Sequence, residues 1–118
     1  MRRELIAFTA MMSLNAGSVA AEPTLDDYLN APNEDAKLVQ SLYLVALYDG
    51  LKWATAYNDV NGLPMMFCVP TNMVLVVEQL DQILVSEAAA GTIESEDFMP
   101  LALIRALQAT FPCDEAAA

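Results

Sequence analysis

Apolar residues recur at helical spacing along most of the chain, most densely in residues 34–57, "EDAKLVQSLYLVALYDGLKWATAY". Two neighbouring apolar stripes run along this segment. The first contains Leu38, Leu42, Val45 and either Tyr48 or Asp49. The second contains Val39, Tyr43, Ala46, Gly50, Trp53 and Tyr57. Because apolar residues occupy most of the circumference, the pattern predicts one long helix that is central in the fold or partly covered by another chain.

Both ends of this helix carry sequence signals. Asn33 is placed to cap the first turn, where Glu34 and Asp35 suit the positive end of the helix dipole. The segment "NDVNGLP", residues 58–64, follows as a linker with turn residues. Gly50 lies mid-helix, where glycine costs about 1 kcal/mol relative to alanine, so we expect another helix to approach closely there.

Two further helices follow the linker. Residues 73–77 fit either a strand or the start of a helix, but helical spacing prevails from about Val76, and Gly91 is placed to end that helix. The last helix is predicted to begin with the acidic signals of residues 95–97 and to stop at Pro112. Its predicted buried face consists of Leu101, Ile104, Leu107 or Gln108, and Phe111.

A short helix is predicted ahead of the long one. Thr24 and Asp27 have capping-box spacing, and Pro32 would stop the helix after one or two turns. The predicted fold class is therefore all-α: a small helical domain of three main helices plus a short leading helix.

The start of the chain has the layout of a secretory signal peptide. Two arginines precede a mostly apolar stretch, residues 5–14, and small side chains at positions 18–21 suit a signal peptidase. An uncleaved anchor and an internal helix are the alternatives, but an anchor needs roughly 20 apolar residues. We therefore expect a cleaved signal peptide, residues 1–21, and a single soluble periplasmic domain, residues 22–118.

Export determines how the two cysteines, Cys68 and Cys113, are interpreted. In an oxidising compartment a pair of cysteines indicates a disulfide first, with two separate buried thiols as the alternative. Cys68 precedes the third predicted helix and Cys113 follows the last one, so an antiparallel pair of these helices would bring the cysteines together. Their wide spacing is unlike the Cys-x-x-Cys of an oxidoreductase, which favours a stabilising role.

The charge balance is strongly acidic. The net charge is −11, and removal of the signal peptide, with two arginines and one glutamate, would take it to about −12. Such a surface disfavours nucleic acid and anionic lipid and would attract a basic partner. The alternative is that the charge only keeps an exported protein soluble.

No combination of residues in the sequence points to catalysis. The chain has no histidine, so a serine or cysteine nucleophile would need Lys37 or Lys52 as its base. Adjacent carboxylates such as Asp26 and Asp27 are ordinary solvated charge on so acidic a surface. The lack of histidine also excludes a Cys/His zinc site. We expect no enzyme activity, no metal and no cofactor.

Four short motifs together resemble a known family. They are "LYDGLKWA", "FCVP", "EQLDQIL" and "ALIRALQATFPC", and the resemblance spans roughly Tyr43 to Cys113. The chain resembles the Tai-type immunity proteins, small exported helical proteins named for members that protect bacteria from the cell-wall amidase effectors of type VI secretion systems. The most specific part is the frame formed by Cys-x-Pro at residues 68–70 and the terminal Phe-Pro-Cys.

The resemblance implies a periplasmic helical domain with a Cys68–Cys113 disulfide, often a dimer, that blocks the active site of an effector. It assigns no residue of this chain to the effector contact. One position departs from the family pattern, in which a threonine or serine commonly caps the helix near position 76, because this chain has Val76.

The sequence therefore predicts a periplasmic binding protein, an immunity-type inhibitor of a secreted cell-wall-degrading effector. The acidic segments "IESED", residues 93–97, and "NDVNG", residues 58–62, are the predicted contact loops. We expect an amidase-like protein partner, a homodimer contact along the long helix, and no binding to nucleic acid or membrane. The alternatives are a small acid-activated periplasmic chaperone and an accessory subunit of an envelope complex.

Overall fold

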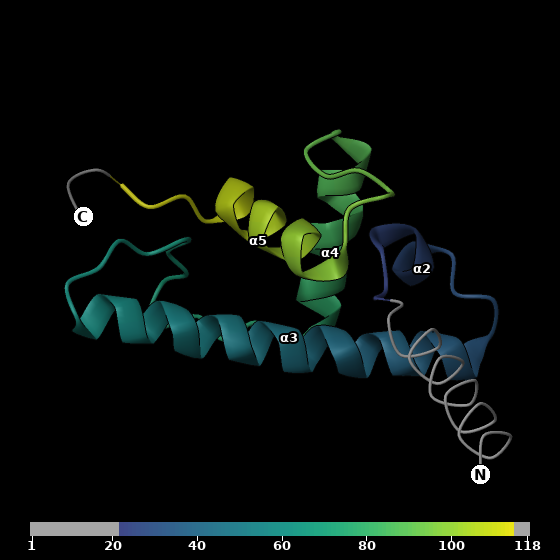
Figure 1. Cartoon of the computed structure of the whole chain (residues 1–118), viewed down its shortest axis with the longest axis horizontal. Coiled ribbons are helices and arrows are strands. Elements are labelled where there is room, and N and C mark those ends of the chain that lie inside the picture. Colours follow the sequence, from purple (N-terminus) through teal and green to yellow (C-terminus); the bar gives the residue numbers. More distant parts are fainter. Residues whose placement is uncertain (1–21, 115–118) are drawn as a thin grey trace, which may run out of the picture.

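A computed structural model describes residues 22–114 of the chain (Figure 1). Residues 1–21, where the sequence predicts a signal peptide, and residues 115–118 lie outside the described part. The described chain consists of the helices α2 (Leu25–Leu29), α3 (Glu34–Val60), α4 (Val77–Ala89) and α5 (Met99–Thr110). The prediction of an all-α fold with three main helices and a short leading one is confirmed, and between residues 22 and 114 the structure contains no strand.

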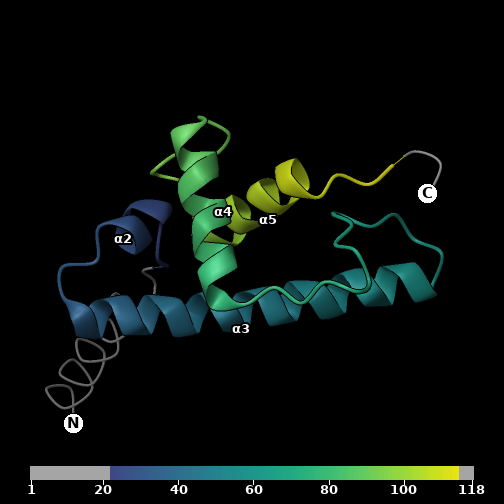
Figure 2. The same ribbon diagram turned by 180° about the vertical axis from the view of Figure 1, so that it is seen from behind.

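Helix α3 is the longest element, and the other helices lie on one side of it (Figures 1 and 2). Its 27 residues make a rod of about 40 Å. Asn33 caps it as predicted, because its side chain accepts a hydrogen bond from the Ala36 N–H at 2.8 Å. The helix ends at Val60, beyond the predicted end, and Gly62 then turns the chain with a φ of +68°.

Helix α2 is short and depends on its neighbours. The predicted capping box is present: the Thr24 N–H donates to the Asp27 carboxylate at 2.9 Å, and the Asp27 N–H donates to the Thr24 hydroxyl at 3.3 Å. The N–H groups of Leu25 and Asp26 donate to carbonyls of residues 95–97 at 2.8 and 2.9 Å. A helix of this length is not stable alone, so these bonds to the segment before α5 hold it in place.

Helix α5 supplies the centre of the core. Its side chains with no exposed surface are Met99, Ala102, Leu103, Ala106 and Leu107. The other helices pack around them with Leu25 and Tyr28 from α2, Leu44 and Tyr48 from α3, and Leu80 and Leu84 from α4.

The buried face predicted for α5 was partly wrong, because Leu101 is 42% exposed. The predicted start was wrong as well. Residues 94–97 form a turn in which the Asp97 carboxylate accepts from the Glu94 N–H at 2.9 Å, and the helix begins only at Met99. The Asp97 carboxylate therefore accepts a hydrogen bond within the turn and does not cap α5.

Helix α4 begins and ends close to the predicted positions. Val76 offers no side-chain acceptor, but the Gln79 side chain accepts a hydrogen bond from the Val76 N–H at 3.0 Å. At the other end Gly91 has a φ of +79°, and the Thr92 N–H donates to the carbonyl of Glu87 at 3.0 Å. This pattern is a Schellman motif, which explains why glycine stands at this position.

Helix α2 also contacts α4 through a hydrogen bond between side chains. The Tyr28 hydroxyl donates to the Asp81 carboxylate at 2.6 Å, and the Tyr28 side chain is only 8% exposed. Burial, and then the hydrogen bond and negative charge of Asp81, raise the pKa of Tyr28 well above its ordinary value. The phenol therefore keeps its proton in the folded chain at pH values where the unfolded chain loses it.

We predict that Tyr28→Phe lowers the free energy of unfolding by about 1.5 to 3 kcal/mol at neutral pH, since it removes one hydrogen bond to a charged acceptor. Because the folded pKa of Tyr28 is raised, its contribution is full below the unfolded pKa of about 10 and is lost as the pH rises above it. Urea titrations at increasing pH should show the difference between wild type and Tyr28→Phe narrowing above about pH 10. Tyr57→Phe, at a residue 65% exposed, is the matched control.

Candidate functional site

Helices α3 and α4 are joined by residues 61–76, here called the strap, which runs back along α3 (Figure 2). The Asn58 side chain donates to the carbonyl of Pro64 at 3.2 Å, and the Met73 N–H donates to the carbonyl of Pro70 at 3.0 Å. Phe67 is 2% exposed and joins the core. The strap is thus an ordered segment held by a few contacts rather than by regular structure.

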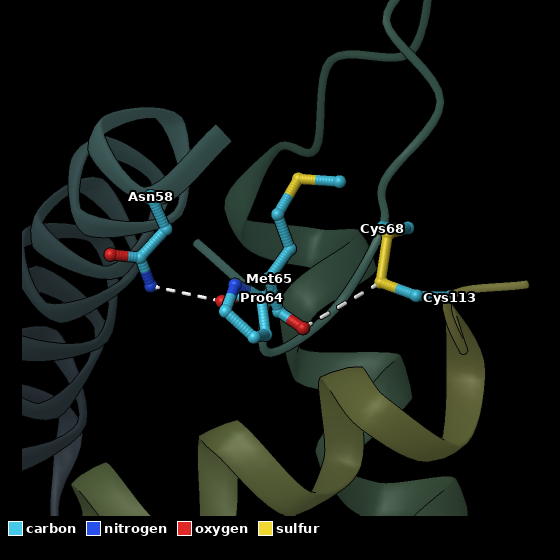
Figure 3. The surroundings of a disulfide bond; sticks show 5 residues. All are labelled: Asn58, Pro64, Met65, Cys68 and Cys113. Atoms are coloured by element: carbon cyan, nitrogen blue, oxygen red, sulfur yellow. Dashed lines mark hydrogen bonds between the residues drawn. A yellow bond between two sulfur atoms is a disulfide. The ribbon is translucent and has the colours of Figure 1, made fainter. Parts of the chain in front are cut away.

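A disulfide between Cys68 and Cys113 joins the middle of the strap to the chain just after α5 (Figure 3). The two Cα atoms are 5.0 Å apart, and the Cys68 N–H donates to the carbonyl of Phe111 at 2.8 Å. The Cys113 Sγ lies 3.9 Å from the carbonyl oxygen of Met65. We regard this as a van der Waals contact, because a disulfide sulfur carries no hydrogen.

The predicted pairing of the cysteines is confirmed, but the expected arrangement of the last two helices is wrong. Helices α4 and α5 cross in both views instead of forming an antiparallel pair (Figures 1 and 2). The disulfide consequently joins the strap to the chain after α5, and Cys68 lies nine residues before α4 begins at Val77.

A hollow of about 350 Å³ lies between the strap and the second half of α3. Its apolar walls include Tyr48, Phe67, Val69 and Met73, and its polar lining includes Lys52, Thr55 and Asp59. The Thr55 hydroxyl oxygen is buried and has no hydrogen-bond partner among the described residues. Burial raises the pKa of Tyr48, and the nearby Lys52 partly offsets that rise. The hollow therefore combines apolar walls with a few polar and charged groups.

The strap exposes several large apolar side chains among its polar ones. Its large exposed side chains are Leu63, Met73, Val74 and Val76, with exposed fractions of 50%, 42%, 81% and 49%. Of these side chains Met73 also lines the hollow, and the disulfide joins the same segment to the chain after α5. A protein surface of this kind is typical of a contact site for another polypeptide.

A second apolar surface lies on α3. We call it the outer stripe, and it consists of Leu38, Val39, Leu42, Val45, Trp53, Tyr57 and Val60, which are 45% to 85% exposed. The residues that α3 buries are instead Leu44 and Tyr48, with Leu47 and Leu51 partly buried. Most residues of the two stripes predicted from the sequence are therefore exposed, and neither stripe contained Leu44. A Cβ atom built on Gly50 would meet nothing within 4 Å, so no helix of the described chain approaches it as expected.

The two acidic segments predicted as contact loops are largely part of the framework. In "IESED" the side chain of Ile93 is buried, and the Asp97 carboxylate accepts from Arg105 at 3.3 Å. In "NDVNG" the first three residues form the last turn of α3. The exposed carboxylates of these segments, Glu94, Glu96 and Asp59, remain available on the surface.

The arrangement of polar groups offers little for chemistry. Lys37 and Ser41 line a hollow of about 210 Å³ together with Tyr28, Gln40 and Asp81. Within residues 22–114 the structure shows no hydrogen bond between the Lys37 and Ser41 side chains that would make them a base and a nucleophile. In the same part of the chain, no group of three cysteine, aspartate or glutamate side chains is arranged to hold a metal ion.

Comparisons with known proteins supply no relative: no family model, no curated protein and no solved structure matches this chain. None of the helices that the structure describes combines the length and the apolar character that crossing a membrane requires. The site is therefore interpreted from its own geometry.

Sequence reasoning identified the two cysteines but missed the hollow, the exposed strap and the unpartnered Thr55 hydroxyl. One signal was available. The run from Met73 to Val77 is apolar beyond what a linker needs, and its first four residues, which are neither strand nor helix, belong to the strap.

We predict that Cys68→Ala together with Cys113→Ala lowers the free energy of unfolding by up to about 4 kcal/mol, because the disulfide closes a long loop in the unfolded chain. Urea titration of the double variant against the oxidised wild type measures this difference. Reduced wild type should match the double variant. Hydrogen exchange should increase most in the strap, whereas equal stability of all three forms would show that the strap does not need the disulfide.

Proposed function

We propose that this protein is an exported periplasmic inhibitor of the immunity type, which blocks a secreted cell-wall-degrading enzyme by binding alone and performs no chemistry of its own. The observation that carries the proposal is the strap. It presents Met73, Val74 and Val76 to solvent beside a hollow, and the disulfide fixes it before any partner arrives. Such preorganisation lowers the entropy cost of binding.

The motifs shared with the Tai-type immunity proteins support the same proposal. They include both cysteines, so the resemblance and the disulfide concern one part of the molecule. A strap that inserts its apolar side chains into the substrate cleft of an enzyme would exclude the substrate without any catalytic residue on the inhibitor. The partner we propose is a secreted amidase-like enzyme.

The negative charge of the chain favours a partner with a basic surface. The chain carries a net charge of −11, and Asp59 lines the hollow while Glu78 follows the strap in the first turn of α4. Complementary charge raises the rate of encounter more than the final affinity. The proposal also includes a second copy of the chain as a partner on a different face, the outer side of α3.

The proposal is tested by using the oxidised protein as bait in a periplasmic extract, identifying the captured proteins by mass spectrometry, and assaying any captured hydrolase with and without the bait. One stoichiometric hydrolase that loses activity on binding is the expected result. Capture of many unrelated proteins, and only after acidification, would contradict inhibition and favour the acid-activated chaperone.

We predict that Val74→Glu weakens inhibition of the captured enzyme by roughly tenfold or more, because a charge would be buried in the contact. The stability of the variant should stay within about 0.5 kcal/mol of wild type, since Val74 is 81% exposed. Val85→Glu, at a 49% exposed position on α4, is the control and should inhibit normally. Equal inhibition by Val74→Glu and wild type would exclude the strap as the contact.

A further inference from the structure

The hollow between the strap and α3 is long and has mostly apolar walls. On the α3 side its lining runs from Tyr48 to Asp59, which is about 16 Å along the helix axis. On the strap side it is lined by Met65, Phe67, Cys68, Val69, Pro70, Thr71 and Met73. The two methionine side chains are flexible, so this wall can adapt to what enters. A volume of about 350 Å³ lies within the range of pockets that bind small groups.

Two charged side chains line the hollow, and only one of them is neutralised within the chain. The Lys52 ammonium group lies 3.2 Å from the Asp49 carboxylate. The other ion pair of the described chain joins Arg105 to Asp97. Among residues 22–114 no lysine or arginine group therefore lies within 4.0 Å of the Asp59 carboxylate. The hollow keeps one uncompensated negative charge beside its apolar walls.

The position of Asp59 in the helix adds to the attraction for a cation. Helix α3 ends at Val60, so Asp59 lies in its last turn, and that turn contains no basic residue. The C-terminal end of a helix carries a partial negative charge, which repels a carboxylate and attracts a positive group. A cation in the hollow would interact favourably with both the carboxylate and the end of the helix.

We propose that the hollow receives an arginine side chain of the partner protein, with the guanidinium group on the Asp59 carboxylate and the aliphatic stem against the apolar walls. This inference rests on the proposed function, because the arginine belongs to the enzyme that the strap contacts. A guanidinium group donates two parallel hydrogen bonds to one carboxylate. It is also more weakly hydrated than the ammonium group of lysine, so it loses less on leaving water. The stem of arginine packs readily along apolar surface.

The hollow is continuous with the exposed part of the strap. Met73 lines the hollow and is also 42% exposed. The last turn of α3 is tied to the strap, because the Asn58 side chain donates to the carbonyl of Pro64 at 3.2 Å (Figure 3). Cys68 lines the hollow too, and its disulfide joins the strap to the chain after α5. A protein bound over the strap would therefore reach the hollow with one of its own side chains.

Binding of a single arginine side chain can be measured on the isolated, oxidised protein. The probe is N-acetyl-arginine amide, and amide chemical shifts in NMR spectra report where it binds. Signals of residues that line the hollow, such as Thr55, Asp59 and Val69, should shift during the titration. N-acetyl-citrulline amide, which has nearly the same shape and no charge, should leave them unchanged. Absence of shifts at tens of millimolar arginine amide, or equal shifts with the citrulline compound, would overturn the proposal.

Two variants at opposite ends of α3 separate the site from the overall charge. Asp59→Asn should weaken binding of the arginine compound by roughly tenfold or more, because it removes a charge-assisted contact. Asp35→Asn removes the same charge from an exposed position in the first turn of α3 and should bind like wild type. An equal loss in both variants would show that the compound follows the net charge of the chain, which would overturn the site.

Stability distinguishes lost binding from lost folding. The midpoint of urea unfolding should be at or above the wild-type value in Asp59→Asn and at or below it in Asp35→Asn, because the two carboxylates lie at helix ends of opposite sign. Weaker binding in a variant that is at least as stable as wild type therefore identifies Asp59 as a contact.

The captured hydrolase then tests whether the arginine is the partner's. Asp59→Asn should weaken inhibition of that enzyme by roughly tenfold or more. If the arginine compound binds in the hollow but Asp59→Asn inhibits as well as wild type, the assignment to the partner is wrong while the proposed inhibition stands. If no captured hydrolase is inhibited, the proposed function fails together with the partner's arginine, even where the compound binds.

Discussion

Burial of α5 against the three other helices is the constraint on which the rest of the structure depends. Five of its twelve residues have no exposed surface, and α2, α3 and α4 all contact it. Full burial of a leucine or methionine side chain contributes about 2 kcal/mol, so this one short helix accounts for much of the apolar stabilisation of a small domain. The flanking segments are tied to its ends. The Met99 N–H donates to the carbonyl of Pro23 at 3.0 Å, and the Phe111 carbonyl accepts from Cys68.

The difference in length between α3 and the helices above it follows from this constraint. Helix α3 has 27 residues, whereas α4 and α5 have 13 and 12, so the core uses one side of α3 and only part of its length. The strap covers part of the remainder and leaves a hollow beneath it. The opposite side of α3 receives no cover from the described residues. Two apolar surfaces therefore exist on two sides of a single helix.

These two surfaces differ in shape and in charge. The outer stripe follows one long helix and has the Asp49–Lys52 ion pair near its centre. The strap is irregular, is joined to the end of α5 by the Cys68–Cys113 disulfide and has the carboxylates of Asp59 and Glu78 near it.

The sequence by itself determined the all-α class, the extents of α3 and α4 to within a few residues, the caps at Thr24, Asn33 and Gly91, and the partnership of Cys68 with Cys113. Each of these depends on residues close together in the chain, or, for the two cysteines, on there being only one pair. Local hydrogen bonding and helical spacing are sufficient for such features.

Only the tertiary structure decided which side of α3 is buried, where α5 begins, and that the strap encloses a hollow. The apolar stripes predicted along α3 contain Leu38 and Leu42 but not Leu44, whereas the structure buries Leu44 and exposes the other two. Both sides of α3 are apolar, so only contact with the other helices decides which side is covered. Likewise Asp97 is a residue type that commonly caps helices. In the structure its carboxylate instead accepts hydrogen bonds from the Glu94 N–H, within a turn, and from the Arg105 side chain. Whether a side chain is buried depends on which segments pack together. The spacing of apolar residues within one segment does not show which distant segment will cover it.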